Sequence, residues 1–232
     1  MKTLFITGTN SGIGKALAEA YLKRGAVVYG LGKKEQSVIE HERFHYLSHD
    51  LQAIETISPK LSKFLREAVS IDIAILNAGL LGEIKEMQYT PLYEIETVMQ
   101  VNVWANKVII DTLIDLQIPV AQIIGISSGA AVNASKGWGS YSLSKSALNM
   151  LLKLYSREME NTHITALAPG VVDTPMVRHI TETVDAIRYP SAQRLKNGPI
   201  LHPEDAARRL IEAFEKVKQY ESGSFLDVRT MD

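Results

Sequence analysis

The sequence predicts a single α/β domain with an open, doubly wound sheet of about seven mostly parallel strands and helices on both faces. Short apolar runs of strand length recur along the 232 residues, with segments of helical length between them. The runs are almost continuously hydrophobic, which is typical of strands covered on both faces of a parallel sheet. Alternating strands and helices then require right-handed crossover connections.

The elements follow one another in a regular order. The predicted strands are the runs at 2–7, 27–31, 43–47, 71–76, 122–127, 164–168 and 224–228. The predicted helices lie at 13–24, 53–68, 91–117 with a break, 141–160 and 203–219. The last helix has the clearest start, because Pro203 suits a first helical turn and Glu204 and Asp205 favour the positive end of the helix dipole.

Residues 173–203 interrupt this pattern with Pro175, Pro190, Gly198 and Pro199. A loop of this length in a compact domain usually covers a binding site. We therefore expect one domain over 1–232 with a flexible substrate loop around 173–203.

Composition and charge exclude several classes of function. Hydrophobic residues make up 46% of the chain and charged residues 22%, close to the average for globular proteins. The net charge of −1 indicates neither nucleic acid nor an anionic membrane as a partner. The absence of cysteine excludes disulfides, thiolate metal sites and a Cys nucleophile. We expect a cytoplasmic protein with no membrane segment that acts on a small molecule.

A glycine-rich turn follows the first strand. In TGTNSGIG, residues 7–14, glycines at 8, 12 and 14 allow a tight turn and let a phosphate approach the backbone at a helix N-terminus. The spacing departs from the usual G-x-G-x-x-G, so an ordinary strand-to-helix turn is the alternative. Its position between a buried strand and a helix favours nucleotide binding.

The end of the second strand carries two lysines in place of an acid. NAD-binding folds often place an acid there to bond the ribose 2′-hydroxyl. Lys33 and Lys34 instead suit a 2′-phosphate, which favours NADP(H) over NAD(H); two solvated loop lysines are the alternative. Asp50, after the third strand, is expected to touch the adenine.

The segment HERFH, residues 41–45, matches a zinc-protease motif, and His49 continues its spacing. That motif requires a helix, on which positions i and i+4 share a face. The segment instead leads into a strand, where His41 and His45 would lie roughly 13 Å apart. We predict no metal site, and a zinc hydrolase is the alternative that this motif leaves open.

Tyr141 and Lys145 stand one helical turn apart at the start of an amphipathic helix. The same spacing recurs at Tyr29 and Lys33, on a strand-to-loop segment, so the pair alone is weak. A phenol needs a lowered pKa to act near neutrality, and a nearby cation can lower it. Ser127 and Ser128 end a strand upstream, where a serine hydroxyl can hold a carbonyl oxygen.

Together these motifs resemble the classical short-chain dehydrogenase/reductase family over essentially the whole chain. The resemblance rests on Thr7-Gly8-x-x-x-Gly12-x-Gly14, Asn77-Ala78-Gly79, Asn102, Ser128, Tyr141-x-x-x-Lys145 and Pro169-Gly170-Val171-Val172-Asp173-Thr174. It implies a Rossmann-type fold that binds NAD(P)H.

The resemblance also implies roles for single residues. Tyr141 would be the catalytic acid/base, Lys145 would lower its pKa and hold the nicotinamide ribose, and Ser128 would orient the carbonyl. Asn102 would support a water that relays protons. The implied cofactor-binding residues are Gly8, Asn10, Ser11, Gly12, Ile13, Gly14, Lys33, Asp50, Leu51, Asn77, Ala78, Gly79, Tyr141, Lys145, Pro169, Gly170, Val172 and Thr174.

Lys136-Gly137-Trp138-Gly139 is similar to the sepiapterin reductase and benzil reductase branch of the family. This suggests NADPH-dependent reduction of a ketone, a diketone or a pterin-like side-chain carbonyl, with Trp138, Leu80, Leu81 and Met176 as candidate pocket walls. A non-catalytic dinucleotide-binding regulator and an NAD-dependent alcohol dehydrogenase are the alternatives. The resemblance further implies a homodimer or homotetramer.

Overall fold

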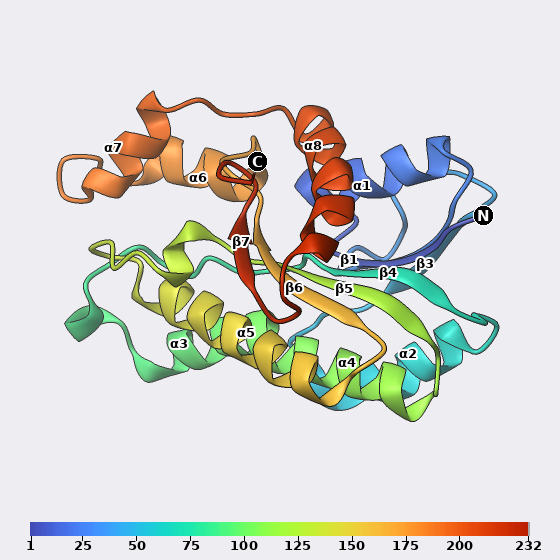
Figure 1. The fold of residues 1–232 in the computed structure, drawn as a ribbon. Coiled ribbons are helices and arrows are strands. Elements are labelled where there is room, and N and C mark those ends of the chain that lie inside the picture. Colours follow the sequence, from blue (N-terminus) through green and yellow to red (C-terminus); the bar gives the residue numbers. More distant parts are fainter. Residues whose placement is uncertain (232) are drawn as a thin grey trace.

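Seven parallel strands form one sheet in the computed structural model, which describes residues 1–231 (Figure 1). The strand order is β3-β2-β1-β4-β5-β6-β7, and each neighbouring pair is parallel. The predicted doubly wound sheet is therefore confirmed. The strands are β1 Thr3–Thr7, β2 Val27–Gly32, β3 Phe44–Ser48, β4 Ile71–Leu76, β5 Val120–Ile126, β6 His163–Ala168 and β7 Phe225–Asp227.

Helices cover both faces of this sheet. In Figure 1, α1 and α8 lie above it, α2, α4 and α5 lie below it, and α6 and α7 extend beyond it on the left. The helices are α1 Gly12–Lys23, α2 Ile57–Leu65, α3 Leu92–Met99, α4 Ala105–Asp115, α5 Gly139–Glu158, α6 Pro175–Thr183, α7 Pro190–Asn197 and α8 Pro203–Lys216.

The two layers explain why the strands are hydrophobic throughout. Successive side chains of a strand point to opposite faces. In β1, Leu4 and Ile6 pack into the core beneath α1 and α8, whereas Phe5 packs into the core beside α2, α4 and α5. All three side chains are fully buried, so the middle of the strand is apolar on both faces.

The helical stretch predicted at 91–117 is continuous, without the expected break. A π-helical turn, Gln100–Trp104, joins α3 to α4. One wider turn re-aims the side chains on either side of it without ending the helix, and such turns are frequent at functional sites. Asn102 lies in this turn.

Residues 173–203 differ from the irregular loop that the prolines predicted, because they contain α6 and α7. Pro175 and Pro190 are each the first residue of a helix, where the missing N–H costs nothing and the fixed φ is already helical. Thr174 caps α6, its Oγ1 accepting a hydrogen bond from the Val177 N–H at 3.3 Å. The prolines therefore start helices here.

Among residues 1–231, no helix combines the length and the hydropathy needed to cross a membrane.

Candidate functional site

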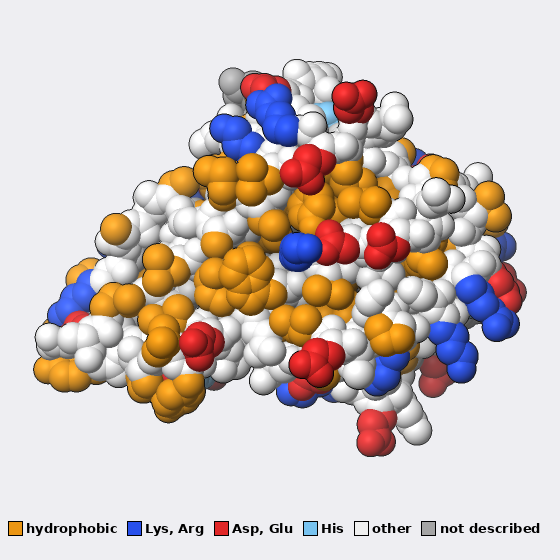
Figure 2. Space-filling model, turned by 90° about the horizontal axis from the view of Figure 1, so that it is seen from below, with side chains coloured by type: hydrophobic (Ala, Val, Ile, Leu, Met, Phe, Trp, Pro, Cys, Tyr) orange, Lys and Arg blue, Asp and Glu red, His pale blue; other side chains and the backbone are white. Residues whose placement is uncertain are grey.

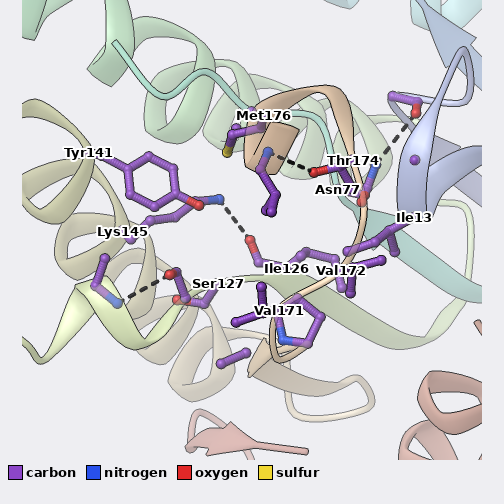
Figure 3. Close-up of a pocket in the computed structure, with 18 of the residues that line it drawn as sticks. Ile13, Asn77, Ile126, Ser127, Tyr141, Lys145, Val171, Val172, Thr174 and Met176 are labelled. Atoms are coloured by element: carbon purple, nitrogen blue, oxygen red, sulfur yellow. Dashed lines mark hydrogen bonds between the residues drawn. The ribbon is translucent and has the colours of Figure 1, made fainter. Parts of the chain in front are cut away.

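A cavity of about 1080 Å³ opens at the carboxyl ends of the central strands, where open α/β sheets bind ligands. Lys33 and Asp50 line one end of it, and Tyr141 and Lys145 line the other. Figure 3 shows the part of the cavity around Tyr141 and Lys145. All of the predicted site residues line it except Gly14 and Asn102. The cavity is therefore lined by residues that lie far apart in the sequence, from Gly8 to Arg229.

The glycine turn forms a close-fitting cradle at one wall. Gly8 has φ +78° and Gly12 has φ +55°, a region that favours glycine. A Cβ at Gly14 would lie 2.4 Å from the Gly8 carbonyl oxygen, so the helix can pack here only without a side chain. Gly14 thus supports the turn from behind, and the start of α1 faces the cavity with free N–H groups that suit a pyrophosphate.

Hydrogen bonds join this turn to the loop after β4. Thr7 Oγ1 accepts from the N–H groups of Asn77 and Ala78 at 2.9 and 3.0 Å. The Asn77 side-chain amide donates back to the Thr7 carbonyl oxygen at 2.9 Å. The two predicted cofactor-binding loops therefore form one rigid floor.

At the far end of the cavity, Lys33 pairs with Asp50, with Nζ 2.7 Å from Oδ2. The Lys33 hydrogen bond holds the pKa of Asp50 below its usual value. Lys33 lines the cavity, but Lys34 does not; the Lys34 N–H donates to Asn10 Oδ1 at 3.1 Å. Of the two adjacent lysines, Lys33 is thus the one whose side chain reaches the cavity.

Tyr141 and Lys145 lie at the opposite end, buried in the first turns of α5. Lys145 Nζ donates to the Ile126 carbonyl oxygen at 2.8 Å and lies 5.6 Å from the centre of the Tyr141 ring (Figure 3). Burial raises the pKa of Tyr141 to about 12, against a smaller lowering by the Ser128 hydroxyl. Burial also lowers the pKa of Lys145 to about 8.

These directions correct one expectation. Lys145 was expected to lower the pKa of Tyr141, yet in the protein alone desolvation dominates and raises it. Burial of the phenol is the larger cause, and the Lys145 amine donates its hydrogen bond to the Ile126 carbonyl oxygen.

The two serines after β5 have different partners. Ser127 is buried, and its Oγ donates to Asn149 Oδ1 of α5 at 2.6 Å. Ser128 Oγ accepts from the Ala130 N–H at 3.1 Å and lies beside Tyr141. Ser128 is therefore the hydroxyl available to a ligand at the phenol.

Asn102 is fully buried and does not line the cavity. Its Oδ1 accepts from the Leu80 N–H at 2.7 Å, and its Nδ2 donates to the Leu80 carbonyl at 2.8 Å and to Ser144 Oγ at 2.9 Å. The side chain therefore ties the loop after Gly79 to α5.

The roof of the reactive end comes from residues 173–203. Met176 and Ile180 of α6 and Ser191 and Leu195 of α7 line the cavity. Apart from Met176, sequence reasoning missed these residues because it assigned no helix here. The i, i+4 spacing of Met176 and Ile180 after a capping Thr174 was the signal that could have found this face.

Trp138 joins this roof to the catalytic helix. Its Nε1 donates to Ser191 Oγ at 2.5 Å, and its ring lies edge-on to Tyr141 with centres 6.1 Å apart. Of the other candidate pocket walls, Leu80 lines the cavity. Leu81 does not line it, but packs against the apolar cluster that contains Trp138 and Tyr141.

The HERFH segment is not helical. His41 Nδ1 accepts from the Arg43 N–H at 3.0 Å, whereas His45 lies in β3 and stacks on Tyr29 at 4.8 Å. His49 instead meets Lys60 Nζ and the Ala53 carbonyl. Within residues 1–231, no three His, Cys, Asp or Glu side chains converge as a metal site would require.

The buried Lys145 should make stability depend on pH. Its pKa is about 8 in the folded protein against 10.5 when free, so over this interval the unfolded chain holds a proton that the folded chain has lost. Stability relative to Lys145→Met should therefore rise as pH increases through this range. Calorimetry of both proteins across the range measures the difference. The exposed Lys153→Met variant of the same helix is the control, and a pH-independent difference for Lys145→Met would contradict burial as the cause.

Comparison with known proteins agrees with this geometry. The family model for short chain dehydrogenases matches residues 2–185. The chain is 29% identical to a benzil reductase of Bacillus cereus, covering 93% of this chain and 96% of that one, and 27% identical to an NADPH-dependent pterin aldehyde reductase of Arabidopsis thaliana, covering 76% and 77%.

A solved structure shows the same fold. A short chain dehydrogenase/reductase of Saccharomyces cerevisiae superposes with a TM-score of 0.85 at 22% identity, covering 98% of this chain and 96% of that one. The sheet order, the glycine turn and the Tyr141–Lys145 helix thus agree with the sequence match, and the chain belongs to the short-chain dehydrogenase/reductase family.

Proposed function

We propose that this protein is an NADPH-dependent carbonyl reductase. The observation that carries the proposal is the meeting of Ser128, Tyr141 and Lys145 at the apolar end of a cavity long enough for a dinucleotide. The family binds a nicotinamide cofactor. Gly8 and Gly12 line the cavity, and an added Cβ would clash with Asn77 or with Thr174, so the turn presents bare backbone to a pyrophosphate.

In the proposed reaction a bound nicotinamide supplies the hydride that adds to the carbonyl carbon. Ser128 Oγ donates a hydrogen bond that orients the carbonyl oxygen. Tyr141 is protonated at neutral pH, and burial raises its pKa further to about 12; it gives its proton to that oxygen as negative charge develops. Lys145 lies close enough to stabilise the resulting phenolate and to help restore its proton.

We further propose that Asn102 acts by positioning rather than through a water. Its bonds to Leu80 and Ser144 fix the loop after β4 against α5, next to the lysine. In this proposal, the Asn102 side-chain amide fixes the distance between the loop after β4, on which the cofactor would lie, and Tyr141.

The shape of the reactive end supports a bulky, apolar carbonyl substrate. Trp138, Met176, Ile180 and Leu195 line it, and the relatives include a benzil reductase and a pterin aldehyde reductase. We propose an aromatic ketone, a vicinal diketone or a pterin-like side-chain carbonyl. The α6–α7 segment, residues 173–203, is proposed to move when the substrate enters.

Replacing Tyr141 by Phe should remove the proton donor and leave the rest of the cavity intact. We expect turnover of a diketone panel with NADPH to fall by roughly 10² to 10⁴, with NADPH affinity nearly unchanged. Steady-state kinetics and calorimetric titration measure the two effects. Undiminished turnover would refute the role of Tyr141, and a wild type that binds cofactor but turns over no carbonyl would favour the non-catalytic regulator.

The preference for NADPH is assigned to Lys33. Lys33→Ala should weaken NADPH binding by roughly tenfold or more, the value of a charge-assisted hydrogen bond, and should affect NADH little. Lys34→Ala is the matched control, because Lys34 does not line the cavity. Titration with both cofactors tests this, and equal affinity of the wild type for NADPH and NADH would favour an NAD-dependent alcohol dehydrogenase instead.

We propose that the protein is a homodimer or homotetramer through the outer faces of α4 and α5. Apolar side chains are exposed along them, and Figure 2 shows such side chains gathered on the lower face of the molecule. The exposed members at this surface are Trp104 at the start of α4, Ile114 of α4, and Leu143, Met150 and Leu154 of α5.

A charge on this surface should dissociate the oligomer. Leu154→Glu should yield monomers in light scattering after gel filtration, because a carboxylate would be buried at the interface. Val69→Glu places the same charge on an apolar residue outside α4 and α5 and should leave the mass unchanged. A monomeric wild type would end the proposal.

A further inference from the structure

We propose that Glu86 is a positioning residue that holds the α6–α7 roof and Trp138 in place over Tyr141, and thereby determines the affinity for a bulky carbonyl substrate. The inference rests on the proposed function, because it concerns the substrate end of the same cavity. Glu86 itself does not line the cavity.

The Glu86 carboxylate gathers donors from two distant segments. Arg188, between α6 and α7, donates from Nε at 3.1 Å and from Nη2 at 2.8 Å. The Tyr189 hydroxyl donates at 3.0 Å, and Lys136 Nζ lies 3.2 Å away. These four contacts, which we call the Glu86 clasp, join the loop after β4, the roof and the segment ahead of Tyr141.

The clasp is more than a surface ion pair. The Glu86 side chain is 22% exposed, and both of its oxygens are engaged. A two-point Arg–carboxylate contact has a fixed geometry that a single Lys contact lacks. The Arg188 hydrogen bonds also hold the pKa of Glu86 at about 2, so the carboxylate stays charged well below neutral pH.

Tyr189 transmits the position of the clasp to the pocket wall. Its ring is buried and packs on Gly137, where an added Cβ would lie 2.6 Å from the ring. Gly137 has φ +87°, and its carbonyl accepts from the Lys85 N–H at 3.1 Å. The residue before Glu86 and the residue before Trp138 are thus bonded to each other while Tyr189 covers them.

Trp138 is the end point of this arrangement. Its backbone forms an isolated β-bridge with Lys85, its indole N–H donates to Ser191 of α7, and its ring lies edge-on to Tyr141. Moving Tyr189 would therefore free both the indole and the start of α7.

The roof depends on such contacts because it has little core of its own. In α6 the one fully buried side chain is Ile180, and in α7 the buried residues are the small Ser191 and Ala192. Without the carboxylate, Lys136 and Arg188 would also face each other as like charges around one ring, at 5.7 and 5.5 Å from its centre. The Glu86 carboxylate thus offsets the repulsion between Lys136 and Arg188 and keeps the roof against the segment ahead of Tyr141.

The first test needs no turnover. In a Trp104→Phe background, Trp138 is the remaining tryptophan, and it is 9% exposed. Glu86→Gln should shift its emission to longer wavelength and should speed hydrogen exchange in residues 184–199, leaving α1 and β1 protected. Unchanged emission and exchange would overturn the proposal whatever the enzyme reduces.

The second test separates binding from chemistry. Glu86→Gln should raise KM for a diaryl diketone by about five- to tenfold, with kcat equal to or above that of the wild type and NADPH affinity unchanged. Glu86→Asp should recover part of the loss. A fall in kcat at constant KM would overturn the positioning role, because it would place Glu86 in the chemical step.

The matched control is Glu83→Gln. Glu83 lies three residues upstream, is 74% exposed and pairs with Lys85 alone. It should change neither the emission nor KM. A double-mutant cycle of Glu86→Gln with Arg188→Gln should be strongly non-additive, whereas additive effects would contradict the clasp. If the wild type reduces no carbonyl, the proposed function fails while emission and exchange still decide on Glu86.

Discussion

The parallel pairing of β1, β4, β5 and β6 is the constraint on which the rest of the structure depends. Because these strands run in one direction and are covered on both faces, each leaves the sheet at the same edge, where the polar residues that follow the strands come together. Thr7 at the end of β1 binds the two backbone amides that follow β4. The cavity is thus a consequence of sheet topology rather than of any one loop.

Burial then determines the chemistry of this edge. The apolar cluster around Trp138, Ile180 and Tyr189 encloses Tyr141, and the strand end encloses Lys145. Removing water disfavours the charged form of each group, which is why the pKa of Tyr141 rises and the pKa of Lys145 falls. Charge that develops on a substrate oxygen here would be stabilised by fixed donors in a weakly polar environment.

The reactive end combines a rigid floor with a roof that is held mainly at its margins. The floor is rigid because hydrogen bonds of Thr7, Asn77 and Asn102 tie its loops to the ends of the strands and to one another. The roof carries few buried side chains, so its local stability depends on Trp138, Tyr189 and the Glu86 clasp. This division would let substrate enter without disturbing the cofactor-binding turn.

The sequence by itself determined the sheet, the glycine turn and the Tyr141–Lys145 helix, because hydrophobic period, glycine geometry and helical spacing are local properties. The tertiary structure alone decided the rest. The prolines of 173–203 start helices because α6 and α7 find a surface to cover, and the Asn102 amide binds Leu80 because a π-turn aims it there. Burial set the pKa of Tyr141, and the partners of Glu86 lie up to 103 residues away in the chain. No local pattern encodes contacts between such distant segments, since they form only when the folded sheet has brought them to one edge.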